Sequence, residues 1–188
     1  ENLQASKDKQ LDFRSKGLAK GGARPNLFQT QLLNAPTQVP TNGEGGWSFT
    51  CKIAAIPAST ISAVEVPYFG RQVKVPGNRT FDNLSVTVIN DEDFGVRNAM
   101  ERWMALMNGH QSNQQIQQAN DLLAEMSIEH YGKEGGQRPI GGGSWNFINI
   151  FPVSLGEIAL DWGSNDTIEE YTIEFAYDYW THGQGRTQ

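Results

Sequence analysis

The stretch from Glu65 to Phe94 constrains the fold of this chain more than any other part of the sequence. β-Branched and aromatic residues at 64–69 and 73–75 predict two strands, because such side chains pack well on a pleated surface. Gly70 between them and Pro76-Gly77-Asn78 after them let a chain reverse, so a β-hairpin is expected. The stretch has no nucleophile beside a base, no metal-ligand spacing and no phosphate-binding loop. Its residues therefore indicate a part that packs against another molecule.

A half-buried strand and a helix are expected directly after the hairpin. Apolar residues alternate with polar ones between Asp82 and Asn90, at the two-residue period of a strand that is buried on one face. Asn90 is a favoured N-cap residue, and carboxylates at 91–93 suit the first turn of a helix, where the helix dipole is positive. The apolar residues that follow at helical spacing are Val96, Met100, Trp103, Met104 and Met107. They predict a helix over about 91–107 that packs one apolar stripe on a sheet.

The rest of the chain adds strands rather than helices. Apolar and aromatic runs predict them at 27–33, 47–56, 122–130, 145–151 and 168–180. In the last run one face is aromatic or aliphatic throughout, and its members are Tyr171, Ile173, Phe175, Tyr177 and Tyr179. The predicted fold class is therefore mainly β, an antiparallel β-sandwich or open barrel with one flanking α-helix at about 91–107.

The length of 188 residues suits one domain whose core needs no disulfide. Residues 1–24 are polar and mildly basic and are interpreted as an N-terminal extension or arm, followed by a β-barrel domain at 25–180 and a C-terminal tail at 181–188. A formal net charge of -6 argues against a surface that binds nucleic acid, and no apolar run approaches the ~20 residues of a membrane span. The lone Cys51 is typical of a protein that folds in a reducing cytoplasm.

Groups that could carry chemistry are scattered along the sequence. His110, His130 and His182 lie far apart, without carboxylates at metal-ligand spacing, so no metal site is expected. The glycine-rich stretch at 135–143 lacks the Gly-Lys-Ser/Thr ending of a phosphate-binding loop and is interpreted as a hairpin tip. No catalytic residue and no cofactor are predicted.

A carbohydrate-binding module or glycosidase built on a β-sandwich is an alternative from a different class of protein. A glycosidase needs a pair of carboxylates, and the candidates are Asp91/Glu92/Asp93, Asp161/Asp166 and Glu169/Glu170. A helix start, a turn and a strand start explain these clusters better. Tryptophans that could line a sugar groove are Trp47, Trp103, Trp145, Trp162 and Trp180. For Trp103 and Trp145, which fall on the apolar helix stripe and on an apolar strand, core packing is the better interpretation.

Four sequence blocks resemble the tail tube proteins of contractile-tailed bacteriophages. They are ARPNLF at 23–28, IPASTI at 56–61 with EVPYFGRQVKVPGNRTF at 65–81, VINDEDF at 88–94 and LDWGSNDTIEEYTIEFAYDYW at 160–180. Together they span nearly all of the chain between Ala23 and Trp180, and the combination is more specific than any single block. The chain departs from the family pattern in the Gln/Asn-rich connection at 108–120 and in the glycine loop at 135–143.

The resemblance implies a structural protein of the virion without enzymatic activity. Tail tube proteins of this family form homohexameric rings that stack into a hollow tube inside a contractile sheath, and the phage genome passes from capsid to host through the tube. The implied partners are further copies of the chain, the tail sheath protein, the baseplate and tail terminator proteins, and passing double-stranded DNA that is not bound specifically. No membrane is implied, and assembly is expected in the cytoplasm of the bacterial host. A baseplate tube initiator of the same fold, which would share all four blocks, is an alternative.

The hairpin is the part of the chain predicted to contact other subunits or an adjacent ring. It is longer than a core of its own explains, and its aromatic pair suits an interface anchor. The predicted contact residues are Tyr68, Phe69, Gly70, Arg71, Gln72, Lys74, Asn78 and Arg79. The predicted helix is expected to face the outside of the tube. The strand positions that line the channel are expected to be polar or acidic, and the candidates are Ser85 and Thr87 or, if the other sheet faces inward, Glu174 and Asp178.

Overall fold

The computed structural model describes residues 23–37, 39–40, 46–109, 119–133, 143–164 and 167–183. Its strands are β1 (Phe28–Leu33), β2 (Cys51–Ala54), β3 (Thr60–Tyr68), β4 (Arg71–Thr80), β5 (Leu84–Ile89), β6 (Ala124–His130), β7 (Trp145–Leu155), β8 (Glu170–Ala176) and β9 (Tyr179–His182). Its helical segments are α2 (Trp47–Thr50), α3 (Gly95–Met107) and the 3-10 turn η2 (Ala119–Leu122). Every strand pairing among these residues is antiparallel. The predicted mainly β class with one flanking helix is confirmed.

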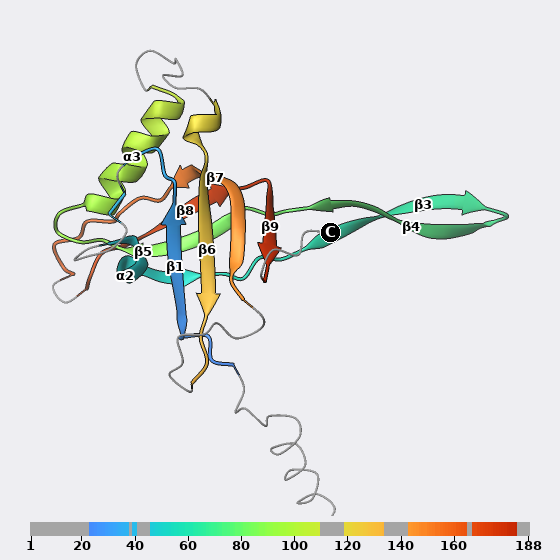
Figure 1. Ribbon diagram of the computed structural model, residues 1–188, viewed down its shortest axis with the longest axis horizontal. Coiled ribbons are helices and arrows are strands. Elements are labelled where there is room, and N and C mark those ends of the chain that lie inside the picture. Colours follow the sequence, from blue (N-terminus) through green and yellow to red (C-terminus); the bar gives the residue numbers. More distant parts are fainter. Residues whose placement is uncertain are drawn as a thin grey trace, which may run out of the picture.

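The β structure has two halves, one with β1, β6 and β9 and the other with β8, β5 and β2. Strand β7 belongs to both halves. Its first residues pair with β6 and β9, and residues 151–155 pair with β8. The strand order is β1-β6-β7-β8-β5-β2, with β9 added on β7. In Figure 1, β1, β6 and β9 run vertically whereas β5 and β8 run horizontally, so the two halves cross at a large angle. Asn149 (φ 57°) and a register shift between Pro152 and Ser154 lie where β7 passes from one half to the other, as expected for a strand that switches sheets.

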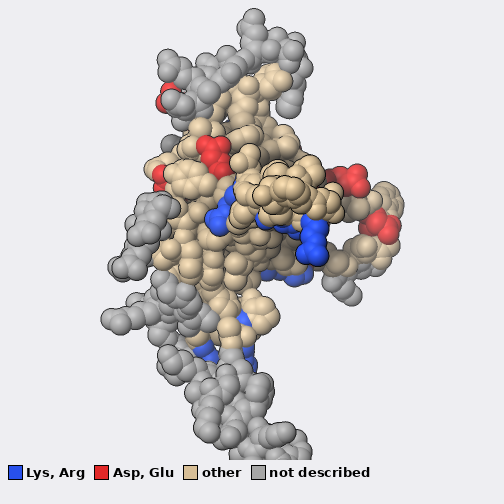
Figure 2. Space-filling model, turned by 90° about the vertical axis from the view of Figure 1, so that its right-hand side faces the viewer, with Lys and Arg blue, Asp and Glu red and all other residues tan. Residues whose placement is uncertain are grey.

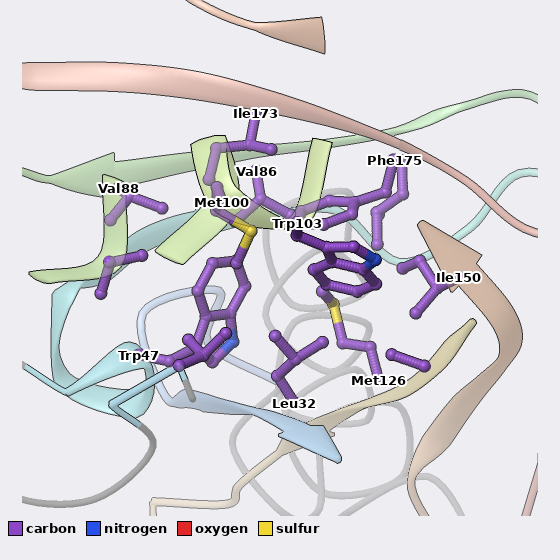
Figure 3. Packing of buried hydrophobic residues seen from close by; sticks show 14 of the residues in the cluster. Leu32, Trp47, Val86, Val88, Met100, Trp103, Met126, Ile150, Ile173 and Phe175 are labelled. Carbon is purple, nitrogen blue, oxygen red and sulfur yellow. The ribbon is translucent and has the colours of Figure 1, made fainter. Parts of the chain in front are cut away.

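The core lies between the two halves and is completed by side chains from α2 and α3. Its largest fully buried side chains are Trp47, Trp103, Phe147, Phe175, Met100, Met126, Ile150 and Ile173. Figure 3 shows Trp47, Met100, Trp103 and Met126 together in the middle of this core. The rings of Trp47 and Phe175 meet edge to face with centroids 5.9 Å apart, a favoured arrangement of aromatic quadrupoles.

Helix α3 buries the apolar stripe that its sequence predicts. Val96, Met100 and Trp103 are buried, together with Ala99. Since these positions recur at three- and four-residue spacing, they occupy one side of the helix and leave the other side for solvent or a partner. Among the described residues, no helix has both the length and the apolar character that crossing a membrane requires.

The predicted start of this helix at residue 91, with Asn90 as its N-cap, is wrong. Asn90 is bound to the chain before β8: its backbone N–H donates to the carbonyl oxygen of Glu169 (2.8 Å) and its Nδ2 donates to Glu169 Oε2 (2.9 Å). Residues 91–94 then form a turn in which the N–H of Phe94 donates to the carbonyl oxygen of Asp91 (2.9 Å). Phe94 is left-handed (φ 51°), and the helix follows it at Gly95.

The predicted strand at 47–56 is shorter than expected because its first residues form α2. The N–H of Trp47 donates to the carbonyl oxygen of Pro40 (2.7 Å). Both the N–H and the Oγ1 of Thr50 donate to the carbonyl oxygen of Gly46 (3.1 Å each). These bonds close one helical turn, which buries the Trp47 side chain, and only 51–54 continues as strand β2.

The predicted strand at 168–180 is divided at Asp178. The N–H of Asp178 donates to the carbonyl oxygen of Ile148 (3.2 Å), and its carboxylate accepts a hydrogen bond from Asn149 Nδ2 (2.6 Å). The chain therefore leaves β8 and continues as β9 along the first part of β7. The predicted apolar face is buried on β8, where Tyr171 and Phe175 lie in the core, whereas Tyr179 on β9 is exposed.

Candidate assembly surface

Strands β3 and β4 form a two-stranded ribbon that projects from the body of the molecule (Figure 1). The ribbon continues from β2 and β5, and within the described part of the chain it pairs with no other strand. All of its residues except Gly77 are exposed. An isolated two-stranded ribbon is at best marginally stable in water. The ribbon is therefore the first candidate for contact with another molecule.

The ribbon reverses at Phe69-Gly70, as the sequence predicts for Gly70. Both residues have positive φ (45° and 74°), as in a type I′ turn. Glycine suits this conformation, but a bulky residue rarely adopts it. The Phe69 side chain is 90% exposed and meets the ring of Tyr68 edge to face at 4.7 Å. The tip thus presents two aromatic rings outside any core of the described chain.

The predicted second reversal at Pro76-Gly77-Asn78 is wrong, because these residues lie inside β4. A register shift between Ile61 and Ala63 of β3 lies opposite them. The Ser62 Oγ donates to the carbonyl oxygen of Asn78 (3.2 Å), and a Cβ on Gly77 would lie 2.5 Å from this hydroxyl oxygen. The glycine is needed here for the close approach of the two strands rather than for a turn.

The two faces of the ribbon differ in character. One face carries the cross-strand pairs Val64–Val75, Val66–Val73 and Tyr68–Arg71. The opposite face carries Pro67–Gln72 and Glu65–Lys74, and the second pair forms an ion pair of 3.6 Å. Since side chains alternate between the faces of a strand, one face is an apolar stripe that ends at the aromatic tip. We call it the valine face.

All eight predicted contact residues lie on this ribbon. Tyr68 and Arg71 belong to the valine face, Gln72 and Lys74 to the opposite face, Phe69 and Gly70 to the turn, and Asn78 and Arg79 to β4 beyond the register shift. The four valines are not among the predicted contact residues, because in the sequence they indicated only strands. A two-residue turn at Phe69-Gly70 pairs Val66 with Val73, so this register was available from the sequence.

Basic side chains outnumber acidic ones on the ribbon. It carries Arg71, Lys74 and Arg79 against the single carboxylate of Glu65. In Figure 2, where the ribbon points toward the viewer, several Lys and Arg side chains lie near the centre of the face, with Asp and Glu side chains above and beside them. A partner of the ribbon tip is therefore expected to be acidic.

A second surface lies in the connection between β7 and β8. It is a hollow of about 520 Å³, and we call it the acidic hollow. Its lining includes Ile158, Leu160, Asp161, Trp162, Ile168 and Glu169. The side chain of Trp162 is 101% exposed and that of Leu160 is 82% exposed. Large apolar side chains so fully in water indicate a second contact surface.

Three of the carboxylates that are candidates for a glycosidase have structural partners. Asp161 Oδ1 accepts the N–H of Gly163 (2.9 Å), Glu169 binds Asn90, and Glu170 forms an ion pair with Lys52. Asp166 lies outside the described residues, and residues 91–93 form the turn before α3. The bonds of Asp161 and Glu169 are those of a turn and a strand start, as the sequence predicts.

His130 and His182, the two histidines that the structure describes, have separate surroundings. The His182 ring stacks on Trp145 with centroids 4.3 Å apart, and His130 Nε2 lies 2.6 Å from the carbonyl oxygen of Arg24. His110 and most of the glycine-rich stretch at 135–143 lie outside the described residues. Within the part of the chain that the structure describes, no three His, Cys, Asp or Glu side chains are grouped so that they could hold a metal ion.

The chain combines a mainly β body with a long ribbon whose residues are almost all exposed. The family model for phage tail tube proteins matches residues 23–183, and the chain belongs to this family. It is 30% identical over 164 residues to tail tube protein gp19 of Enterobacteria phage T4. The aligned residues cover 84% of this chain and 90% of the relative. Family membership makes the chain a tail tube protein.

Solved structures of contractile injection systems share the fold. A chain of the anti-feeding prophage baseplate superposes with a TM-score of 0.61 at 15% identity, covering 87% of this chain and 97% of that chain. A sheath/tube terminator chain of the extracellular contractile injection system PVC gives a TM-score of 0.60 at 17% identity, covering 85% and 95%. These likenesses establish the fold.

Proposed function

We propose that the chain assembles into homohexameric rings that stack into the tube of a contractile tail, and that this tube conducts the phage genome from capsid to host. The proposal applies to this chain the ring and tube assembly of tail tube proteins. The uncovered valine face is the observation that supports it. The eight predicted contact residues, from Tyr68 to Arg79, act at the contacts between subunits or rings.

The energetics of the ribbon favour a partner. Full burial of a valine side chain contributes roughly 1.5–3 kcal/mol, and each of the four valines on the valine face is about half exposed. The left-handed conformation of Phe69 costs roughly 1–2 kcal/mol and gains no burial within the chain. A neighbouring subunit that covers this face would offset both terms.

The open edges of the β structure support self-assembly as well. Strands β1 and β2 stand at the two ends of the strand order, and each pairs with one strand among the described residues. Unpaired strand edges invite pairing with another chain, and a closed ring satisfies such edges without unlimited growth.

Helix α3 belongs on the outside of the tube in this proposal, because its buried stripe leaves Glu101 and Arg102 exposed. This is where the tail sheath protein would contact the tube. Baseplate and tail terminator proteins would contact its ends. The chain is a component of the virion, assembles in the bacterial cytoplasm and carries no enzymatic activity in this proposal.

The test compares two half-exposed valines, one on the ribbon and one on β7. Val73→Asp places a carboxylate on the valine face, and Val153→Asp places the same group outside the ribbon. We expect V73D to leave a folded monomer that forms no stacked tubes, because burying the new carboxylate in an interface is unfavourable. V153D should assemble like the parent chain. Circular dichroism checks the fold and electron microscopy checks assembly, and normal tubes from V73D would contradict the proposal.

A baseplate tube initiator is the second candidate, supported by the likeness to the anti-feeding prophage baseplate chain. An initiator would form single rings that do not continue into tubes. Electron microscopy of the parent protein across a concentration series separates the two functions, because only a tube protein extends ring by ring.

A further inference from the structure

We propose that the acidic hollow is the docking site for the ribbon tip of a second copy of the chain. The inference rests on the proposed function in one respect, since both require self-assembly. It goes further by assigning the residues that receive the ribbon, which line the hollow at 158–162, 164 and 167–170.

The hollow offers apolar surface that suits an aromatic tip. Leu160, Trp162 and Ile168 line it and are all largely exposed, so the chain itself does not cover them. Phe69 at the ribbon tip is exposed as well, and its backbone is held in a conformation that a bulky residue rarely adopts. Burying an aromatic side chain against Trp162 removes apolar surface from water on both sides of the contact.

The charges of the two surfaces are complementary. Residues 156–170 contain no Lys or Arg, whereas the ribbon has a net positive charge. Lys52 balances Glu170, but Asp161 is bound by the backbone N–H of Gly163 and by no cation among the described residues. On the ribbon, Lys74 is balanced by Glu65, whereas Arg71 beside the tip has no ion pair within the described chain. Arg71 and Asp161 are therefore the unbalanced charges available to pair between copies.

The two surfaces lie at opposite ends of the same strands. The ribbon joins β5 at its first residue, Leu84, whereas the hollow joins β8 at Glu170, which pairs with Ile89 at the far end of β5. In Figure 1 the ribbon extends to the right, away from the body. The ribbon therefore points away from the hollow of its own chain and is available to another copy.

Two different surfaces at opposite ends make a head-to-tail contact. Such a heterologous contact closes into a ring when the rotation between neighbours allows it, and otherwise propagates as a filament. In a ring and in a filament alike, every subunit repeats the same contact. A single complementary pair of charges therefore affects every contact of this kind in the assembly.

A charge-reversal pair tests the contact. Arg71→Glu alone and Asp161→Arg alone each place like charges at the contact, and we expect either to raise the critical concentration for assembly at least about tenfold. The double variant R71E/D161R restores opposite charges and should assemble near the parent concentration. Asp121→Arg, an exposed carboxylate on η2, is the matched control, and R71E/D121R should remain as deficient as R71E. Sedimentation velocity and electron microscopy provide the readout.

Disulfide cross-linking tests the same contact without relying on the strength of assembly. In a Cys51→Ala background, a mixture of a Phe69→Cys chain and a Leu160→Cys chain should give cross-linked dimers on oxidation of assemblies, and each chain alone should give far fewer.

The outcomes separate the two proposals. Tubes from the parent chain, with no effect of R71E or D161R and no Phe69–Leu160 cross-link, would overturn this docking site and leave the proposed function standing. Absence of rings and tubes from the parent chain would overturn both. Saturable binding of a soluble glycan that D161R abolishes without changing assembly would assign the hollow to carbohydrate binding instead.

Discussion

Trp103 in α3 donates a hydrogen bond from its indole Nε1 to the carbonyl oxygen of Leu122 in η2, at 2.8 Å. The tryptophan side chain is 0% exposed and lies within the core (Figure 3). The hydrogen bond is therefore made in the protein interior. It connects the helix to the segment that leads into β6. One side chain thus supplies both apolar packing and the partner of a buried backbone carbonyl.

Trp103→Phe should lower the free energy of unfolding by roughly 1–3 kcal/mol, because the carbonyl oxygen of Leu122 loses its donor and stays buried. Urea denaturation of dilute, unassembled protein measures the change. Trp162→Phe is the control, since this fully exposed side chain should change the value by no more than about 0.5 kcal/mol. Equal effects of the two substitutions would contradict the assigned role of Trp103.

Gly156→Ala should destabilise the monomer by roughly 1–3 kcal/mol. A Cβ at this position would lie 2.8 Å from the carbonyl oxygen of Thr172, which is a backbone atom of β8 and cannot move without disturbing its pairing with β5. Gly163→Ala is the matched control, because the nearest atom to its Cβ would be a side-chain oxygen of Asp161 at 3.5 Å. Thermal unfolding of both variants measures the difference, and a tolerated G156A would show that the strands move apart at low cost.

Burial raises the pKa of the Cys51 thiol to about 11, above its ordinary value of 9.0. The folded protein therefore keeps a proton between these pH values that the unfolded chain releases, and the resulting stability is complete below pH 9 and lost as the pH rises toward 11. We expect the free energy of unfolding to fall over this range and to fall less steeply in Cys51→Ala. Burial also raises the pKa of Tyr171 to about 12, which affects both proteins alike. If the free energy of unfolding changed with pH in the same way in the parent and in Cys51→Ala, Cys51 would not be the source of the pH dependence.

Assembled tubes should have negligible affinity for double-stranded DNA at physiological salt. The chain has a formal net charge of -6, and tight binding of DNA requires clustered cations that release counterions. Fluorescence anisotropy with a labelled duplex, measured over a salt series, provides the readout. Tight binding that weakens steeply with added salt would contradict a passive conduit.

Features set by neighbouring residues were predictable from the sequence. The alternation of Leu84, Val86 and Val88 identifies β5, and the spacing of Met100 and Trp103 identifies the buried side of α3, because each pattern follows from the geometry of one element. The start of α3 was not predictable in this way. It depends on the bond between Asn90 and Glu169, which are 79 positions apart in the sequence.

The candidate surfaces were predictable only in part. The turn at Gly70 and its aromatic neighbours pointed to the ribbon tip, and all eight predicted residues lie on the ribbon, although Asn78 and Arg79 lie far from its tip. The valine face was missed because alternating valines look the same in sequence whether another element covers them or not. The acidic hollow was missed because Leu160 and Trp162 come together with Ile168 only when the connection between β7 and β8 folds.

The continuous backbone of β7 has a mechanical consequence. A pull that separates the two halves of the β structure is resisted by the peptide backbone of β7 as well as by core packing. Hydrogen bonds of an antiparallel pair lie perpendicular to the strands, so tension along β5 and β8 shears a whole row of bonds at once instead of opening them one by one. Since the ribbon continues from β2 and β5, tension applied at its tip enters the body along this row. A pull along the direction in which the ribbon points therefore loads many hydrogen bonds of the body together.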